Sequence, residues 1–264
     1  MEERNLIRKQ AFDVFFIRFP VVIIMMLICF ALTLTINFIT KTIASSLSNQ
    51  YINTFISIIQ TLLTLQLMYG YNKTLIRINS NEEVRDLFRF IKDAKSRIKA
   101  PILCIVLIAL VASLYMIVTL FIGSLSISLV STMDNNPTFI HTLSIFTAFV
   151  SIFITIYKII PYEFAFIILA KDEEKKISAI QALKDSKNIL KNHVFDYILL
   201  LLPILLVFLL VVTIFGAINV YVYEIFSNPL IYYAMPALLL IILTPIVRLI
   251  EINYYDYLIS ENNK

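Results

Sequence analysis

Six long apolar runs, separated by shorter polar segments, dominate the pattern of hydrophobic and polar positions along this chain of 264 residues. A helix needs about 20 apolar residues to cross roughly 30 Å of hydrocarbon, and each run is long enough for one crossing. The runs cover approximately residues 19–39, 51–69, 102–130, 138–157, 197–223 and 225–247. The pattern predicts an all-α polytopic membrane protein, a single integral membrane domain over residues 1–264 with six transmembrane helices.

Basic residues gather in alternate segments between these runs. All of the 22 lysines and arginines except Lys41 lie within residues 4–18, 73–99, 158–191 or 248–264. The other side receives only Lys41, Asp134 and Glu224, in the short loops 40–50 and 131–137 and near a turn at Ser227-Asn228-Pro229. Because an excess of Lys and Arg marks cytoplasmic loops, both termini are predicted to be cytoplasmic.

The amino-acid composition indicates where the protein is located. Hydrophobic residues make up 59% of the chain and charged residues only 15%, against roughly 25% charged residues in soluble domains. The usage of Asn, Ile and Lys favours a low-GC, Gram-positive-type bacterium, which predicts the bacterial cytoplasmic membrane as the location. The net charge of +4 belongs to cations that flank apolar spans. It therefore indicates a bilayer with an anionic inner leaflet as the partner rather than nucleic acid.

Two cytoplasmic segments of soluble length are predicted to form amphipathic surface helices. In the first, about residues 73–100, Ser80 and Glu83 make a capping-box pattern ahead of the helically spaced Val84, Leu87, Phe88, Ile91 and Ile98. In the second, about 171–195, Asp172 is the expected N-cap. Both helices would lie apolar face down on the inner surface. The predicted surface for lipid or a membrane or cytoplasmic protein partner consists of Arg85, Arg89, Lys92 and Lys95.

The two segments also resemble each other. Lys92-Asp93-Ala94-Lys95 aligns with Lys184-Asp185-Ser186-Lys187 at an offset of 92, and Glu82-Glu83 with Glu173-Glu174 at an offset of 91. A fainter copy begins at Glu2-Glu3. We interpret the pattern as three units of surface helix plus transmembrane hairpin, approximately residues 1–72, 73–170 and 171–264. The alternative is two unrelated helices beside the membrane.

Motifs for cofactors, metals or catalysis are absent from the sequence. Three glycines leave no phosphate-binding or dinucleotide loop, so no cofactor is expected. Cys29 and Cys104 lie in apolar runs without ligand spacing, and His141 and His193 fall on opposite sides of the predicted membrane, so no metal is expected. No residue is predicted to be catalytic.

Four ionisable residues near the inner ends of two spans form the candidate binding site. Lys158 and Glu163 bracket Pro161, which can open the helix and free carbonyl groups. Arg248 and Glu251 lie one turn apart near the end of the last span. Together they predict a polar cavity facing the cytoplasm. The alternative is that these side chains simply reach the interface, as charged residues at helix ends commonly do.

A family resemblance rests on a series of short motifs. They are Pro161-Tyr162, residues 168–172, residues 178–186, Leu190-Lys191-Asn192-His193 and Tyr254-Tyr255-x-Tyr257-Leu258. In these motifs, residues 80–258 resemble an uncharacterised bacterial multi-pass membrane family, domain of unknown function 975, which is similar in layout to the membrane domain of glycerophosphodiester phosphodiesterases. Members usually carry a glycine where Asn192 stands. The resemblance implies the topology and no activity, because the soluble catalytic domain of those enzymes is missing.

Three classes of function are compatible with these features. The leading hypothesis is a non-enzymatic accessory or scaffold protein that functions at the cytoplasmic face. The alternative is a transport component, either a permease subunit coupled to a separate ATPase or an export or self-immunity factor for a membrane-active peptide. A membrane-embedded lipid enzyme using Glu163 or Glu251 is the third.

Overall fold

A computed structural model describes residues 2–46, 49–84, 86–133, 137–226 and 229–262, and their side chains outside 129–137 and 215–237. Every regular element in these ranges is a helix. Six segments are long and apolar enough to cross a membrane, which confirms the predicted number of spans. The six long helices are α2 (Phe19–Ser46), α3 (Gln50–Asn79), α5 (Lys99–Met133), α6 (Pro137–Ile159), α9 (Val194–Phe226) and α10 (Pro229–Asn262). The predicted turn at Ser227-Asn228 and the residues Arg85, Asp134 and Lys264 lie outside the described ranges.

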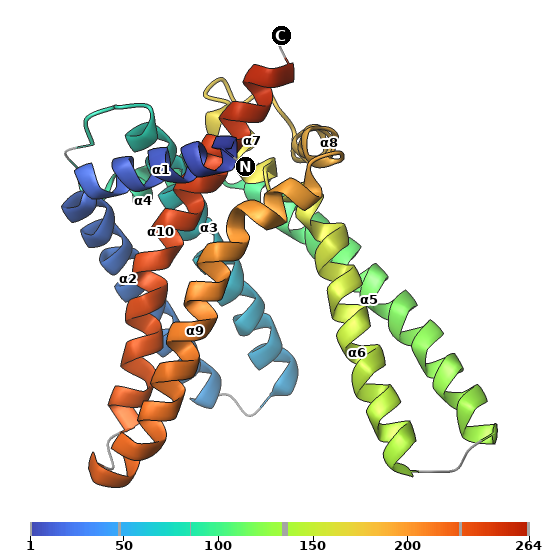
Figure 1. Cartoon of the computed structure of the whole chain (residues 1–264). Coiled ribbons are helices and arrows are strands. Elements are labelled where there is room, and N and C mark those ends of the chain that lie inside the picture. The colour runs from blue at the N-terminus through green and yellow to red at the C-terminus, as the bar shows by residue number, and fades with distance from the viewer. Residues whose placement is uncertain (1, 47–48, 85, 134–136, 227–228, 263–264) are drawn as a thin grey trace.

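The long helices form three hairpins of different placement (Figure 1). The α2–α3 and α9–α10 hairpins lie together, and α10 contacts both α2 and α3. The α5–α6 hairpin diverges from them toward its tip, as Figure 1 shows in green and yellow-green. It stays joined to the rest of the molecule at its other end, where α5 contacts α3, α7 and α8.

The short helices gather at one end of the molecule, which we call the charged end (Figure 1). The start of α1 and the end of α10 lie there too. Each of three short helices contacts the end of a long one: α1 lies on α10, α4 on α3, and α8 on the turn η1 that follows α6. The short elements are α1 (Glu2–Ile17), α4 (Arg89–Ser96), η1 (Ile160–Tyr162), α7 (Ala165–Lys171) and α8 (Ala179–Leu190).

Buried side chains concentrate at the charged end. Only 6% of the apolar window of α3 and none of that of α5 is buried inside the protein, as expected where lipid would cover the surface. In α7, by contrast, all residues from Ile167 to Ala170 are buried. The chain bends at Pro161 in η1, and this bend brings α7 into the centre of the charged end.

The predicted start of the first surface helix is wrong. Ser80 ends α3: its backbone N–H donates to the Ile76 carbonyl, and Asn81 has a left-handed φ of 62°. The next helix, α4, begins only at Arg89. The physical reason is that Lys73 and Arg77 find polar partners within the protein, so α3 continues beyond the apolar run instead of ending with it.

The predicted N-cap of the second surface helix is also wrong. Ser178 caps α8 by accepting from the Gln181 N–H, whereas Asp172 directly follows α7. The Asp172 carboxylate accepts from the Ile177 N–H at 2.7 Å and pairs with Arg97. Its partner thus comes from a distant segment, which local capping rules do not reveal.

Candidate functional site

Three of the four residues of the predicted cavity form one ion cluster. Arg248 Nη1 lies 2.6 Å from Glu163 Oε1 and 2.5 Å from Glu251 Oε2. The hydroxyl of Tyr197, from α9, donates a hydrogen bond to Glu251 Oε1 at 2.7 Å. Glu251 is 3% exposed, so its charge depends on these two partners. The cluster ties the segment after η1 to α9 and α10.

Aromatic rings fix the same junction. The Phe164 ring meets the Tyr197 ring edge-on, with centroids 5.8 Å apart, and meets Tyr255 in the same way at 5.5 Å. Tyr197 also stacks on Tyr254. Phe164 and Tyr197 are both buried. The packing holds the Tyr197 hydroxyl in place, because an aromatic side chain surrounded by other rings has few rotamers available.

A slot between α9 and α10 leads to this cluster. It has a volume of about 320 Å³, and apolar side chains such as Ile204, Phe208 and Leu243 line its length. Arg248 and Glu251 line its end nearest the charged end. One guanidinium faces two carboxyl groups there, so the slot suits an apolar group that ends in a small polar or cationic one. Both carboxyl groups pair with Arg248.

Lys158 does not join the cluster. It is exposed near the end of α6, and its ammonium lies 5.8 Å from the centroid of the neighbouring Tyr157 ring. The bend at Pro161 separates it from Glu163: the Pro161 carbonyl accepts a hydrogen bond from Ser186 on α8 at 2.8 Å. The Pro161 carbonyl therefore binds the protein's own α8.

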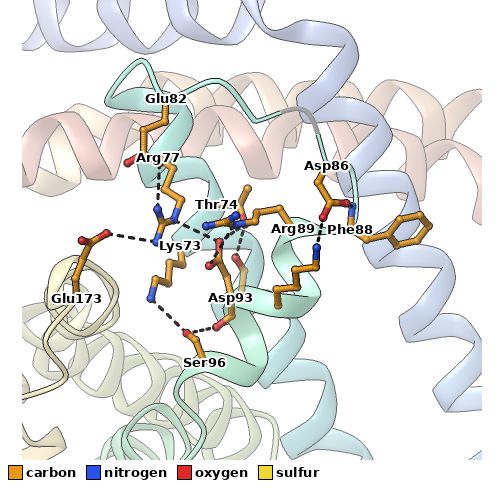
Figure 2. Close-up of polar contacts among 12 residues, drawn as sticks. Lys73, Thr74, Arg77, Glu82, Asp86, Phe88, Arg89, Asp93, Ser96 and Glu173 are labelled. Carbon is orange, nitrogen blue, oxygen red and sulfur yellow. Dashed lines mark hydrogen bonds and ion pairs between the residues drawn. The ribbon is translucent and has the colours of Figure 1, made fainter.

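A second polar cluster joins α3 to α4, with Asp93 at its centre (Figure 2). Thr74 donates to Asp93 Oδ2 at 2.9 Å, Arg77 Nε lies 3.6 Å from the same oxygen, and Arg89 Nε lies 3.8 Å from Oδ1. Asp93 is 4% exposed. Two cations and a hydroxyl thus compensate one buried carboxylate, as a charge in a poorly solvated place requires.

The same network reaches beyond α4. Arg77 also pairs with Glu82 at 3.0 Å and with Glu173, in the segment before α8, at 3.3 Å. Buried Lys73 donates to Ser96 at 3.3 Å. Beneath them, a Cβ placed on Gly70 would lie 2.7 Å from Ala94 Cβ and would overlap the Phe90 carbonyl oxygen. The backbones of α3 and α4 therefore touch.

Arg97, which follows α4, connects that segment to α7 and to the segment after α7. Its Nη1 lies 2.9 Å from Asp172 Oδ2 and donates to the Leu169 carbonyl at 3.0 Å, while its Nη2 donates to the Ile177 carbonyl. Both charged side chains are less than a tenth exposed. Burial alone would raise the pKa of Asp172, but the Ile177 N–H and the Arg97 guanidinium outweigh burial and lower that pKa below its ordinary value.

The predicted lipid or partner surface divides into paired and unpaired cations. Arg89 faces Asp93, and Lys92 pairs with Asp86 at 2.6 Å, which lowers the pKa of Asp86. Lys95 is exposed. Arg85 lies outside the described residues. Of the three described members, only Lys95 has no acidic partner within the described ranges.

Sequence reasoning did not assign a site role to four residues of these clusters, namely Asp93, Arg97, Asp172 and Tyr197. A signal existed for two of them: Phe90, Asp93, Ala94 and Arg97 follow the spacing i, i+3, i+4, i+7, which places them on one helix face. The apolar members of that face indicate that its charged members are buried with it.

Ligating side chains do not cluster in the described ranges: no group of three His, Cys, Asp or Glu residues there could hold a metal ion. Cys29 and Cys104 are buried free thiols. The fold defines the class of the molecule, a multi-pass helical membrane protein. No family model, no curated protein and no solved structure matches the chain. The resemblance to domain of unknown function 975 stays a prediction.

Proposed function

We propose that this protein is a non-enzymatic scaffold of the bacterial cytoplasmic membrane, with its charged end in the cytoplasm. The orientation follows from the positive-inside rule. In this role the charged end presents a rigid surface to anionic lipid and to a protein partner, and the six spans hold it at the bilayer.

One observation carries the proposal: the short helices are fixed to the ends of the spans by buried polar contacts. Asp93 fixes α4 to α3, Ser186 fixes α8 to the turn η1, and Arg97 links the segment after α4 to Asp172. A scaffold needs a permanent shape, and buried polar contacts of this kind provide one. Fixed attachment favours the scaffold.

The three-unit repeat is part of the proposal. Ala94 and Ser186 occupy equivalent places in the two aligned motifs, and each contacts the span end before it, at Gly70 and Pro161 respectively. These two contact points are 91 residues apart, the same offset as the paired glutamates. In the first unit α1 lies on α10 of the third unit, so each surface helix would cover the end of the hairpin of a neighbouring unit in a closed ring.

Site-specific photo-crosslinking in intact cells tests the scaffold. A benzoyl-phenylalanine at exposed Lys184 or Lys187 on α8 is expected to capture one and the same protein. Benzoyl-phenylalanine at Phe149, which is exposed on α6, is the matched control and should not capture that protein. Absence of any protein adduct on α8 would refute the scaffold role.

The slot between α9 and α10 favours a second candidate, a transport component. An apolar path that ends at Arg248 and Glu251 is a reasonable place for an amphiphilic substrate. Capture of an ATPase by α8, together with an export defect in Phe208→Trp, whose larger ring would narrow the slot, would replace the scaffold by the transporter.

A further inference from the structure

An apolar groove of about 330 Å³ opens at the charged end between α2, α3, α4 and α5. On α3 it extends from Ile59 to Leu67, a distance of roughly 12 Å along the helix axis. The groove therefore begins at α4 and continues into the part of the molecule that lipid would surround. Six of its lining residues matter here: Ile59, Leu63, Gln66, Leu67, Lys95 and Ile98.

The residues that line the groove expose almost no polar atoms to an occupant. Gln66 is its buried amide, and the Gln66 Nε2 donates to the Ala94 carbonyl at 2.5 Å and to the Arg97 carbonyl at 2.8 Å. Leu63 and Ile98 are about half exposed, so they form an apolar surface open to an occupant. Such a surface suits an alkyl chain.

The mouth of the groove carries uncompensated positive charge. Lys95 lines it and is exposed, and Lys99, also exposed, follows one residue after Ile98. No lining residue is acidic. Within the described ranges no carboxylate pairs with Lys95, in contrast to Arg89 and Lys92 on the same helix. An anionic group beside Lys95 would therefore gain an ammonium partner.

We propose that the groove binds one acyl chain of an anionic phospholipid, whose phosphate is held by Lys95. The size favours a lipid chain over a partner protein, because an α-helix with its side chains is about 10–12 Å wide and does not enter a space of this volume. The proposal rests on the proposed function only where that function places the charged end at an anionic leaflet.

The test uses the full-length protein in phosphatidylcholine vesicles that contain a small fraction of phosphatidylglycerol with a photoreactive diazirine in one acyl chain. After irradiation, labelled peptides are mapped by mass spectrometry. Labelling of Ile59, Leu63 or Ile98 is expected to exceed labelling of Phe149 on α6, which is exposed but lies outside the groove. Unlabelled phosphatidylglycerol should compete, whereas phosphatidylcholine and inorganic phosphate should not.

Two lysine variants on one helix make the matched comparison. Lys95→Gln should lower groove labelling about fivefold, the change expected when one cation near an anionic surface is lost. Lys92→Gln, which removes a cation already paired with Asp86, should leave it unchanged. Lys95→Arg should retain it, which separates a charge effect from misfolding.

Equal labelling of the groove and Phe149, or equal effects of Lys95→Gln and Lys92→Gln, would overturn the lipid site. Competition by inorganic phosphate alone would also overturn the site, because the acyl chain would then contribute nothing to binding. None of these results bears on whether α8 captures a protein, so failure of the lipid site and failure of the scaffold can be told apart.

Discussion

The charged end and the α5–α6 hairpin are held together by different kinds of contact. At the charged end, α3 and α4 touch backbone to backbone at Gly70, and buried ions at Asp93 and Arg97 leave little freedom. In the hairpin, Gly123 faces the Thr147 side chain rather than backbone. The charged end is therefore made rigid by backbone contact and buried ions. The α5–α6 hairpin is held instead by side-chain contacts and by the lipid around it.

The largest expected effect comes from Arg97→Met. The change leaves the Asp172 carboxylate buried without its cation, and such a loss costs about 3–5 kcal/mol of folding free energy. The measurement is thermal unfolding in detergent, followed by a thiol-reactive dye that detects the buried Cys29 and Cys104. Lys92→Met, at an exposed ion pair, is the control, and an equal loss in both variants would contradict the assignment.

Replacing each glycine by alanine compares the two regions directly. Gly70→Ala forces the Phe90 carbonyl and α4 to move, and we expect a loss of about 1–3 kcal/mol in unfolding free energy. Gly123→Ala meets only a methyl group of Thr147, and the better helix propensity of alanine, about 1 kcal/mol, offsets that contact. If both variants unfold at the same temperature, the two regions do not differ as described.

A smaller effect is expected at the ion cluster. Tyr197→Phe removes the hydroxyl that donates to Glu251, and hydrogen bonds to charged groups contribute about 1.5–3 kcal/mol. Tyr115→Phe, at an exposed position on α5, should change stability by less than about 0.5 kcal/mol. The same unfolding assay measures both. A stability change in Tyr197→Phe no larger than in Tyr115→Phe would show that the cluster contributes nothing to the fold.

The smallest expected effect is that of pH, because the contribution of Asp172 to stability changes only in acid. Because the folded-state pKa of Asp172 is lowered, its stabilisation is complete above the unfolded value of about 3.9 and is lost as pH falls through the folded value. The difference in unfolding temperature between wild type and Asp172→Asn should thus be constant from pH 7 to 5 and should narrow below about pH 4. A constant difference down to pH 3 would refute the role of this carboxylate.

The spans could be predicted from the sequence because burial in lipid depends on local apolar length alone. Pairings at the charged end could not, since each depends on segments far apart: Arg97 with Asp172, and Arg248 with Glu163. Three of the four residues of the candidate site lie together, as predicted from their places near span ends: Glu163, Arg248 and Glu251. Their role as a binding site stays a prediction. Lys158 was included by proximity in sequence, and the bend at Pro161 could not be anticipated from that proximity.

The contact of α1 with α10 has a consequence for biosynthesis. Ile7, Ala11 and Phe15 are almost fully buried in the folded protein, yet α10 is made long after α1. At about 5–20 residues per second, the ribosome leaves the first helix without this partner for on the order of 10 to 50 s. During that interval the bilayer surface or a chaperone must shelter its apolar face. A chain truncated before α10 would leave that face permanently uncovered, and cellular quality control would then recognise it.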